Sequence, residues 1–176
     1  MKHYYYHNPT SPEIELVHSN IDTQGLAPYK ELLSSRPANA ELPKWLGCYG
    51  EVSLAFTLDF GSFRDIQRHR AVTQRMPLLT AEIGFNNWYL EQLTPELRAE
   101  ATTLITSQKE AIEGLTPDSN LRQYYLPMGY NISNYLTGDL PSLVYLIEIR
   151  ATSLVHPTLA TKAGMVGTLL TEKFSE

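Results

Sequence analysis

The sequence predicts an α+β fold in one domain, residues 1–176, with a sheet packed against several helices. Two observations lead to this prediction. One segment alternates apolar and polar residues with the period of a strand, and two later segments carry helix-start signals ahead of apolar stripes. The 176 residues are 43% hydrophobic, which is enough apolar surface for a real core. We expect no internal repeat.

The first 47 residues are rich in proline and show no sustained period, so they are predicted to form mainly loops. A short strand is expected near residues 13–18 and one short helix near residues 28–34. His3, His7 and His18 fall in this region at spacings that predict no metal site. They are expected to be ordinary surface residues.

The clearest strand follows this region. Its apolar side chains should face one side and its polar side chains mostly the other, which is typical of a half-buried strand. The apolar set is Val52, Leu54, Phe56 and Leu58, and the polar set is Ser53, Thr57 and Asp59. Gly61 ends the strand. Ser62 with Asp65 then predicts a capped helix that carries Arg68, His69 and Arg70.

Three further helices are expected in the second half of the chain. Thr94 and Pro95 begin one that runs to Gly114, with a capping hydroxyl followed by a proline at the first helical position. Asp139 caps another, which ends near Arg150. The last begins at residues 156–157 and runs through residue 170, interrupted by two glycines.

Charge and cysteine content limit the classes of function. The chain has 14 Lys and Arg against 19 Asp and Glu, a net charge of -5, which argues against extended binding of DNA or RNA. Cys48 is the single cysteine, so no internal disulfide or thiolate zinc cluster can form. No secretory signal and no membrane helix are evident, and we expect a cytoplasmic protein.

A local basic motif stands out in this acidic chain. Arg64, Arg68, His69 and Arg70 fall within seven residues, beside one acid, Asp65. Guanidinium groups match phosphate oxygens and stay charged at cellular pH, so the motif suits a phosphate or pyrophosphate. On a helix the arginines two residues apart would diverge by roughly 200° and would need partners on more than one side. A basic run of this kind is more often a solvated helix face.

The order and spacing of three motifs resemble the flavin-dependent thymidylate synthases. That family carries Arg-His-Arg after a strand–helix unit, then an arginine shortly before Leu-Pro, then an arginine on a late helix. The resemblance covers roughly residues 50–170, and the interval from Leu-Pro to the late arginine matches the family's. The counterparts here are Arg68-His69-Arg70, Arg122-Gln123-Tyr124-Tyr125-Leu126-Pro127 and Arg150. The resemblance implies the fold of thymidylate synthase-complementing proteins.

The resemblance also implies a flavin cofactor. Arg68, His69 and Arg70 would contact FAD in a site assembled from several subunits of a homotetramer. Asp139 stands where the family commonly has an asparagine near the flavin, although its use as a helix cap is the better interpretation. Tyr145 stands where the family commonly has a histidine or asparagine.

Two arginines would hold the nucleotide deoxyuridylate (dUMP). Arg122 and Arg150 occupy the places where the family binds its phosphate and base. One extra residue separates Arg122 from Leu-Pro, so Gln123 could be the true counterpart. Arg150 could instead be a cation that only stabilises a helix C-terminus.

Two positions depart from the family. Met76 and Leu78 stand where the family usually has a Glu and a Ser that contact the nucleotide, so no catalytic nucleophile is assigned. Each unpaired polar partner would weaken binding by about 1–3 kcal/mol. The segment from Thr73 to Arg75 could supply replacement contacts. Trp88 and Tyr89 could stack on a flavin, although packing is the more frequent use of such a pair.

Three hypotheses follow. The first is reductive methylation of dUMP to dTMP, with NADPH as reductant, methylenetetrahydrofolate as one-carbon donor and FAD as cofactor. The second is a divergent relative that binds a flavin or pyrimidine nucleotide without synthase activity. The third is a related flavin enzyme acting on a different pyrimidine nucleotide. No metal is expected in any of them.

Overall fold

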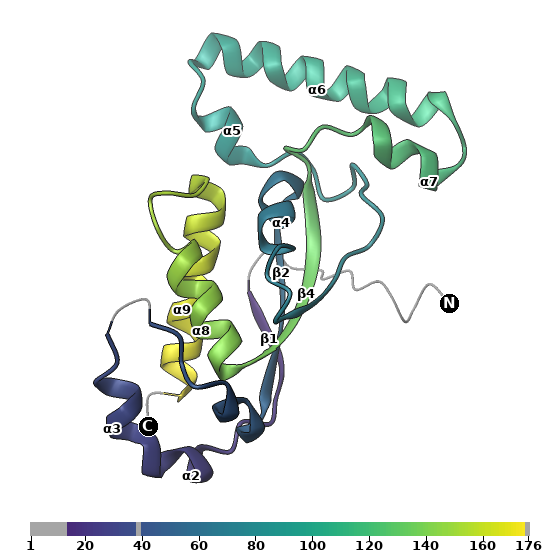
Figure 1. Cartoon of the computed structure of the whole chain (residues 1–176). Coiled ribbons are helices and arrows are strands. Elements are labelled where there is room, and N and C mark those ends of the chain that lie inside the picture. The colour runs from purple at the N-terminus through teal and green to yellow at the C-terminus, as the bar shows by residue number, and fades with distance from the viewer. Residues whose placement is uncertain (1–13, 38–39, 175–176) are drawn as a thin grey trace.

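The computed structural model describes residues 14–37 and 40–174, and its architecture is α+β (Figure 1). An antiparallel sheet forms the centre, and helices of very different lengths surround it. In chain order the elements are β1 (Glu15–Ser19), α2 (Thr23–Leu26), η1 (Ala27–Tyr29), α3 (Lys30–Ser34), η2 (Lys44–Tyr49), β2 (Glu51–Asp59), α4 (Phe60–Ile66), β3 (Thr73–Arg75), α5 (Asn87–Glu91), α6 (Pro95–Leu115), α7 (Ser119–Arg122), η3 (Gln123–Tyr125), β4 (Asn131–Asp139), α8 (Leu140–Arg150) and α9 (Pro157–Phe174).

The sheet has the strand order β1-β2-β4-β3, with every neighbouring pair antiparallel. β2 and β4 pair without interruption from Glu51↔Asp139 to Asp59↔Asn131. The short β3 pairs with the end of β4, beginning at Thr73↔Thr137. Because β2 and β4 are antiparallel, the helices that follow them start from opposite ends of the sheet.

The core lies between the sheet and helices α4, α8 and α9. Leu54 and Phe56 of β2 meet Ile66 of α4, Leu143 of α8 and Val166 of α9 around a void of only about 10 Å³. A void of this size holds one water at most. Figure 1 shows α8 and α9 side by side next to the central strands. No ligand can therefore enter this part of the core.

The expectation that β2 is half-buried is wrong. The polar residues Ser53, Thr57 and Asp59 are 5%, 5% and 0% exposed, as inaccessible as their apolar neighbours. A central strand has both faces covered, and its polar face is only partly paired, because the buried hydroxyl of Thr57 and Oδ1 of Asp59 have no hydrogen-bond partner. The hydroxyls of Ser53 and Thr137 are 2.8 Å apart across the ladder. The alternation therefore separates an apolar face from a hydroxyl-rich face, both of them buried.

The helix after β2 also differs from the expectation. Asp59, not Ser62, is the N-cap, and α4 ends at Ile66 before the Arg-His-Arg motif. The amide of His69 donates to the carbonyl of Ile66 at 2.9 Å, and Nε2 of Gln74 donates to the same carbonyl at 2.8 Å. Carbonyls at a helix end need such partners. The motif lies in the turn after the helix, so the divergence expected for helical arginines does not apply.

The three later helices are confirmed. Thr94 caps α6 through the amide of Leu97, and Asp139 caps α8. The apolar stripe of α6 is not a core stripe, however, because Ile112 is its one buried residue and Leu104 is 66% exposed. Figure 1 shows α6 lying across one end of the molecule, with α7 folded back beneath it.

The units β2–α4 and β4–α8 are two copies of one strand–helix design, which corrects the expectation of no repeat. Each strand has nine residues and ends in an aspartate that caps the next helix. The carboxylate of Asp59 accepts from the amide of Ser62 at 2.9 Å, and that of Asp139 accepts from the amide of Ser142 at 2.8 Å. The caps therefore lie at opposite ends of the paired strands.

The two copies keep the same spacing from the capping aspartate to an arginine, Arg70 in the first and Arg150 in the second, each followed by alanine. Ala55 and Tyr135 hold equivalent places in the copies and pair with each other at the middle of the ladder. A local two-fold axis therefore relates the copies at that point. Most equivalent positions carry different residues, which hides the repeat from inspection of the sequence.

The N-terminal segment packs on α8. The expected short strand and helix are present as β1 and α3. Arg36 donates to both carboxylate oxygens of Glu148, with Nη1 to Oε2 at 3.1 Å, and also to the carbonyl of Ala40. This ion pair ties the segment to the helix that carries Arg150. His3 and His7 lie outside the described residues.

Within the described ranges, no helix combines the length and the apolar character needed to cross a bilayer.

Candidate functional site

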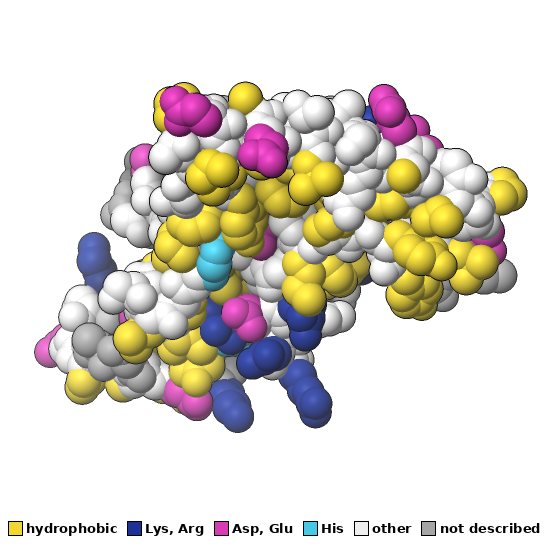
Figure 2. Space-filling view, turned by 90° about the horizontal axis from the view of Figure 1, so that it is seen from above, with side chains coloured by type: hydrophobic (Ala, Val, Ile, Leu, Met, Phe, Trp, Pro, Cys, Tyr) yellow, Lys and Arg dark blue, Asp and Glu magenta, His cyan; other side chains and the backbone are white. Residues whose placement is uncertain are grey.

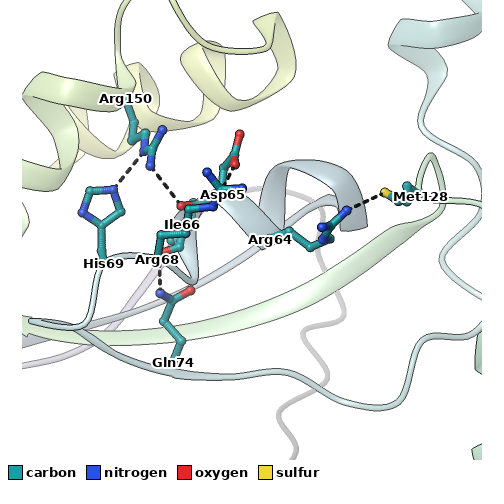
Figure 3. Close-up of polar contacts among 8 residues, drawn as sticks. All are labelled: Arg64, Asp65, Ile66, Arg68, His69, Gln74, Met128 and Arg150. Carbon is teal, nitrogen blue, oxygen red and sulfur yellow. Dashed lines mark hydrogen bonds and ion pairs between the residues drawn. The ribbon is translucent and has the colours of Figure 1, made fainter.

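The late arginine and the Arg-His-Arg motif, distant in sequence, meet in the structure. Nε of Arg150 donates to Nε2 of His69 at 2.9 Å, and Nη2 donates to the carbonyl of Asp65 at 3.1 Å (Figure 3). Arg150 is the last residue of α8, and the other two lie at and just beyond the C-terminal end of α4. Two hydrogen bonds from different atoms fix the plane of a half-buried guanidinium.

His69 is held as a neutral imidazole. Its Nε2 accepts a hydrogen bond, so its proton is carried by Nδ1. Burial is the first cause that lowers the pKa of His69 below its ordinary value of 6.5, and the Arg150 cation is the second. The ring also makes an edge contact with Tyr145, with centroids 6.2 Å apart. A neutral His69 can therefore orient Arg150 at physiological pH.

The remaining arginines of the motif are more exposed. Nε of Arg68 lies 3.6 Å from the carboxylate of Asp65, but its side chain is 72% exposed, so this pair adds little stability. Arg70 is exposed, and Arg64 donates to the sulfur of Met128 at 3.2 Å. Figure 2 shows basic side chains gathered along one edge of the face seen from above. Arg68 and Arg150, which both contact Asp65, and the exposed Arg70 next to His69 form a positively charged site in an acidic protein.

An open hollow of about 370 Å³ lies beside the motif, at the other end of α8. Asp139 lines it together with Ala71 and Thr73, which directly follow the motif, and with Gly47. A Cβ on Gly47 would lie 2.5 Å from Oδ2 of Asp139, so only glycine leaves this carboxylate room. Asp139 and the segment after Arg70 therefore line the same hollow. Arg150 lies at the opposite end of α8.

The structure places Arg122 and Gln123 away from Arg150 within one chain. Arg122 ends α7, and its Nη2 donates to the carbonyl of Pro117 at 3.1 Å, while its buried Nε has no hydrogen-bond partner. Nε2 of Gln123 donates to the carbonyl of Asn120 at 3.1 Å. α7 folds against α6, on the opposite side of α4 from α8 (Figure 1).

The two positions that depart from the family are half-buried. Met76 packs against the main core, and Leu78 has intermediate exposure. In the segment expected to replace them, Gln74 is already bonded to Ile66, and the guanidinium of Arg75 lies 4.3 Å from the ring centroid of Tyr135. Thr73 is therefore the residue of this segment that lines the hollow.

No family model matches the chain. It is 31% identical over 126 residues to the UPF0159 protein of Chlamydia pneumoniae, covering 70% of this chain and 23% of that protein. It is 32% identical over 111 residues to the UPF0159 protein of Chlamydia muridarum, covering 62% and 20%. It is 28% identical over 102 residues to that of Thermoplasma acidophilum, covering 57% and 20%. The chain thus spans about a fifth of the length of these relatives, whose names state no activity.

A second polar cluster, which the sequence did not predict, lies at the N-terminal end of α4. Tyr89 donates to the buried carboxylate of Asp59, and hydroxyl contacts join Ser62 to Thr158 and His156. The members come from separate parts of the chain and share no motif spacing. The one sequence signal for this cluster was the adjacent pair of aromatic residues, Trp88 and Tyr89. Within the described ranges, no group of three or more His, Cys, Asp or Glu side chains could hold a metal ion.

Proposed function

We propose that this chain is a flavin-dependent thymidylate synthase-like protein, which converts dUMP to dTMP with methylenetetrahydrofolate, NADPH and FAD. The observation that carries this proposal is the direct bond between His69 and Arg150, at 2.9 Å. The resemblance assigns these residues to the flavin and the nucleotide, and a shared site requires that they be neighbours.

Of the two arginines that the resemblance gives for the phosphate and the base, we assign the phosphate of dUMP to Arg150. Its Nε and one terminal nitrogen are already held by the protein, which orients the guanidinium before the ligand arrives. A preorganised guanidinium loses less conformational freedom on binding than a free one. A hydrogen bond to a charged group contributes about 1.5–3 kcal/mol, so loss of Arg150 should weaken nucleotide binding at least tenfold.

The residues present fit a flavin nucleotide. Arg68 and Arg70 are exposed cations suited to a pyrophosphate, His69 lies between them, and the hollow beside them leaves Asp139 as an acceptor for hydroxyl or ring N–H donors. The glycine at position 47, where a Cβ would crowd this carboxylate, keeps that acceptor accessible. FAD, when bound, would supply the hydride chemistry, and the protein would supply binding and orientation.

Arg122 and Gln123 would serve the site from another copy of the chain. Both lie on the arm formed by α6, α7 and η3, whose long helix buries only Ile112. Leu104 and Leu115 of this arm are 66% and 59% exposed. An exposed apolar arm that carries predicted substrate-binding residues supports a homotetramer with shared sites.

A second candidate is a flavin- or nucleotide-binding relative without synthase activity. Met76 favours it, because this residue packs against the core where the family has an acid. The third hypothesis, a different pyrimidine nucleotide, relies on Thr73, Gln74 and Arg75. It receives less support, because Gln74 already bonds Ile66 and Arg75 already contacts the ring of Tyr135.

Two measurements test the proposal in order. The purified chain should show the absorption of oxidised flavin. Arg68→Ala should lose the flavin, and Lys109→Ala, which removes a partly exposed cation on α6, should retain it. Expression should then allow a thymidine-requiring strain that lacks its own synthase to grow, and Arg150→Ala should abolish that growth. A yellow protein that does not support growth would leave the second candidate. A folded, colourless protein that binds neither FAD nor dUMP would refute both.

A further inference from the structure

A hydrogen-bonded network crosses the N-terminal half of α4. The hydroxyl of Tyr89 donates to Oδ2 of Asp59 at 3.1 Å, next to the cap bond from Ser62. Oγ of Ser62 lies 2.7 Å from Oγ1 of Thr158, which lies 2.7 Å from Nδ1 of His156. Burial and the neighbouring Asp59 raise the pKa of Tyr89 to about 12, so its hydroxyl stays protonated as a donor. The network fixes the imidazole through one nitrogen.

Aromatic rings surround that imidazole. His156 lies edge to face with Trp88, with centroids 4.7 Å apart, and stacks on Tyr89 at 5.4 Å with planes 29° apart. All three side chains are half-buried, so ring surface stays open to solvent. Because Nδ1 is the nitrogen that faces Thr158, Nε2 points toward the other edge of the ring. The cluster therefore combines stacking surface with one oriented polar atom.

This cluster lies next to the Arg150 site. Ser62, which anchors Thr158 and His156, and Asp65, whose carbonyl holds Arg150, are three residues apart on α4. Three residues rise about 4.5 Å along a helix and return to nearly the same side. Arg150 is also the last residue of α8, and His156 is the last residue of the short segment that joins α8 to α9. Figure 2 shows hydrophobic side chains around a hollow beside the basic edge.

The internal repeat gives a second reason to connect the His156 cluster with the Arg150 site. His156 and Thr158 hold the places in the second copy that Met76 and Leu78 hold in the first, counted from Arg150 and Arg70. Met76 packs against the core, whereas His156 and Thr158 are polar and half-buried, and Thr158 links His156 to Ser62 of α4. The polar side chains that could contact a ligand are thus in the copy that carries Arg150.

We propose that Trp88, Tyr89 and His156 form a base-binding subsite for the pyrimidine nucleotide whose phosphate Arg150 binds. The aromatic rings stack on the planar base, and Nε2 of His156 hydrogen-bonds its edge. This inference rests on the proposed function, because it takes the phosphate position from Arg150. Stacking of a base on an aromatic side chain contributes enough that its loss weakens binding about tenfold or more.

The test compares two ligands that share a phosphate. Calorimetric titration of the full chain is done with dUMP and with 2-deoxyribose 5-phosphate, which lacks the base. Trp88→Ala and His156→Asn should weaken dUMP binding about tenfold or more and leave 2-deoxyribose 5-phosphate unchanged. Asparagine keeps a polar group toward Thr158 but removes Nε2. Arg150→Ala should weaken both ligands, and Trp45→Phe, at the other tryptophan, should weaken neither.

The outcomes separate this inference from the proposed function. If the wild-type chain binds dUMP no more tightly than 2-deoxyribose 5-phosphate, no base subsite exists and only the inference fails. The same holds if Trp88→Ala and His156→Asn bind dUMP like the wild type, or lose affinity for both ligands equally. If the wild-type chain binds neither ligand, the proposed function fails and the inference fails with it.

Discussion

The bond between His69 and Arg150 makes nucleotide affinity depend on the protonation of one histidine. Nε2 of His69 accepts from Nε of Arg150, so a proton on Nε2 would abolish the bond and set a second cation against the arginine. Asp65, Arg68 and the neighbouring Arg70 are charged groups beside this pair, and Tyr145 contacts the ring edge to face. We therefore expect affinity for dUMP to fall as the pH drops below 6.5.

The magnitude follows from the geometry. Hydrogen bonds to charged groups contribute about 1.5–3 kcal/mol, and a half-buried pair belongs at the lower end, so His69→Leu should weaken dUMP binding about tenfold. His69→Gln retains an acceptor oxygen and should lose no more than about threefold. Because the pKa of His69 is lowered in the fold, the unfolded chain binds more protons just below pH 6.5. The histidine's stabilising contribution is thus present above pH 6.5 and is lost as the pH falls.

The assay is calorimetric titration with dUMP between about pH 5 and pH 8 for the wild type, His69→Gln and His69→Leu. The phosphate of dUMP itself gains a proton near pH 6, so the informative quantity is the ratio of wild-type to His69→Gln affinity at each pH. That ratio should decline on acidification, because glutamine does not titrate. A constant ratio, together with equal affinity of His69→Leu and the wild type, would refute the reasoning that His69 orients Arg150.

Two stability predictions follow from buried polar contacts. Asp59→Ala removes a buried helix cap and leaves the half-buried Tyr89 hydroxyl without its acceptor, so the free energy of unfolding should fall by about 2–4 kcal/mol in urea titration. Asp118→Ala, which removes the exposed cap of the short helix α7, should cost less than about 1 kcal/mol. Glu148→Gln should lower that free energy by about 1–3 kcal/mol, because it breaks a pair with Arg36 whose side chains are 14% and 27% exposed. Glu113→Gln breaks an exposed pair on α6 and should change it by less than about 0.5 kcal/mol; equal losses in either comparison would contradict the prediction.

Local signals were sufficient for most of the elements. Thr94 with Pro95, and Asp139, predicted the starts of α6 and α8, because capping depends on groups only a few residues apart. The alternation from Val52 predicted β2 for the same reason. The same local logic failed after Asp59, since Ser62 also resembles a cap and nothing nearby indicates where α4 ends.

The sequence by itself determined the α+β class, the main helices and a local concentration of positive charge, because each depends on neighbouring residues. Only the tertiary structure decided that β2 is buried on both faces, that the Arg-His-Arg motif lies in a turn, and that Arg150 bonds His69. These facts depend on the register of β2 against β4, which brings α4 and α8 together from distant parts of the chain. No local pattern specifies which strands pair, so the site is a consequence of that pairing.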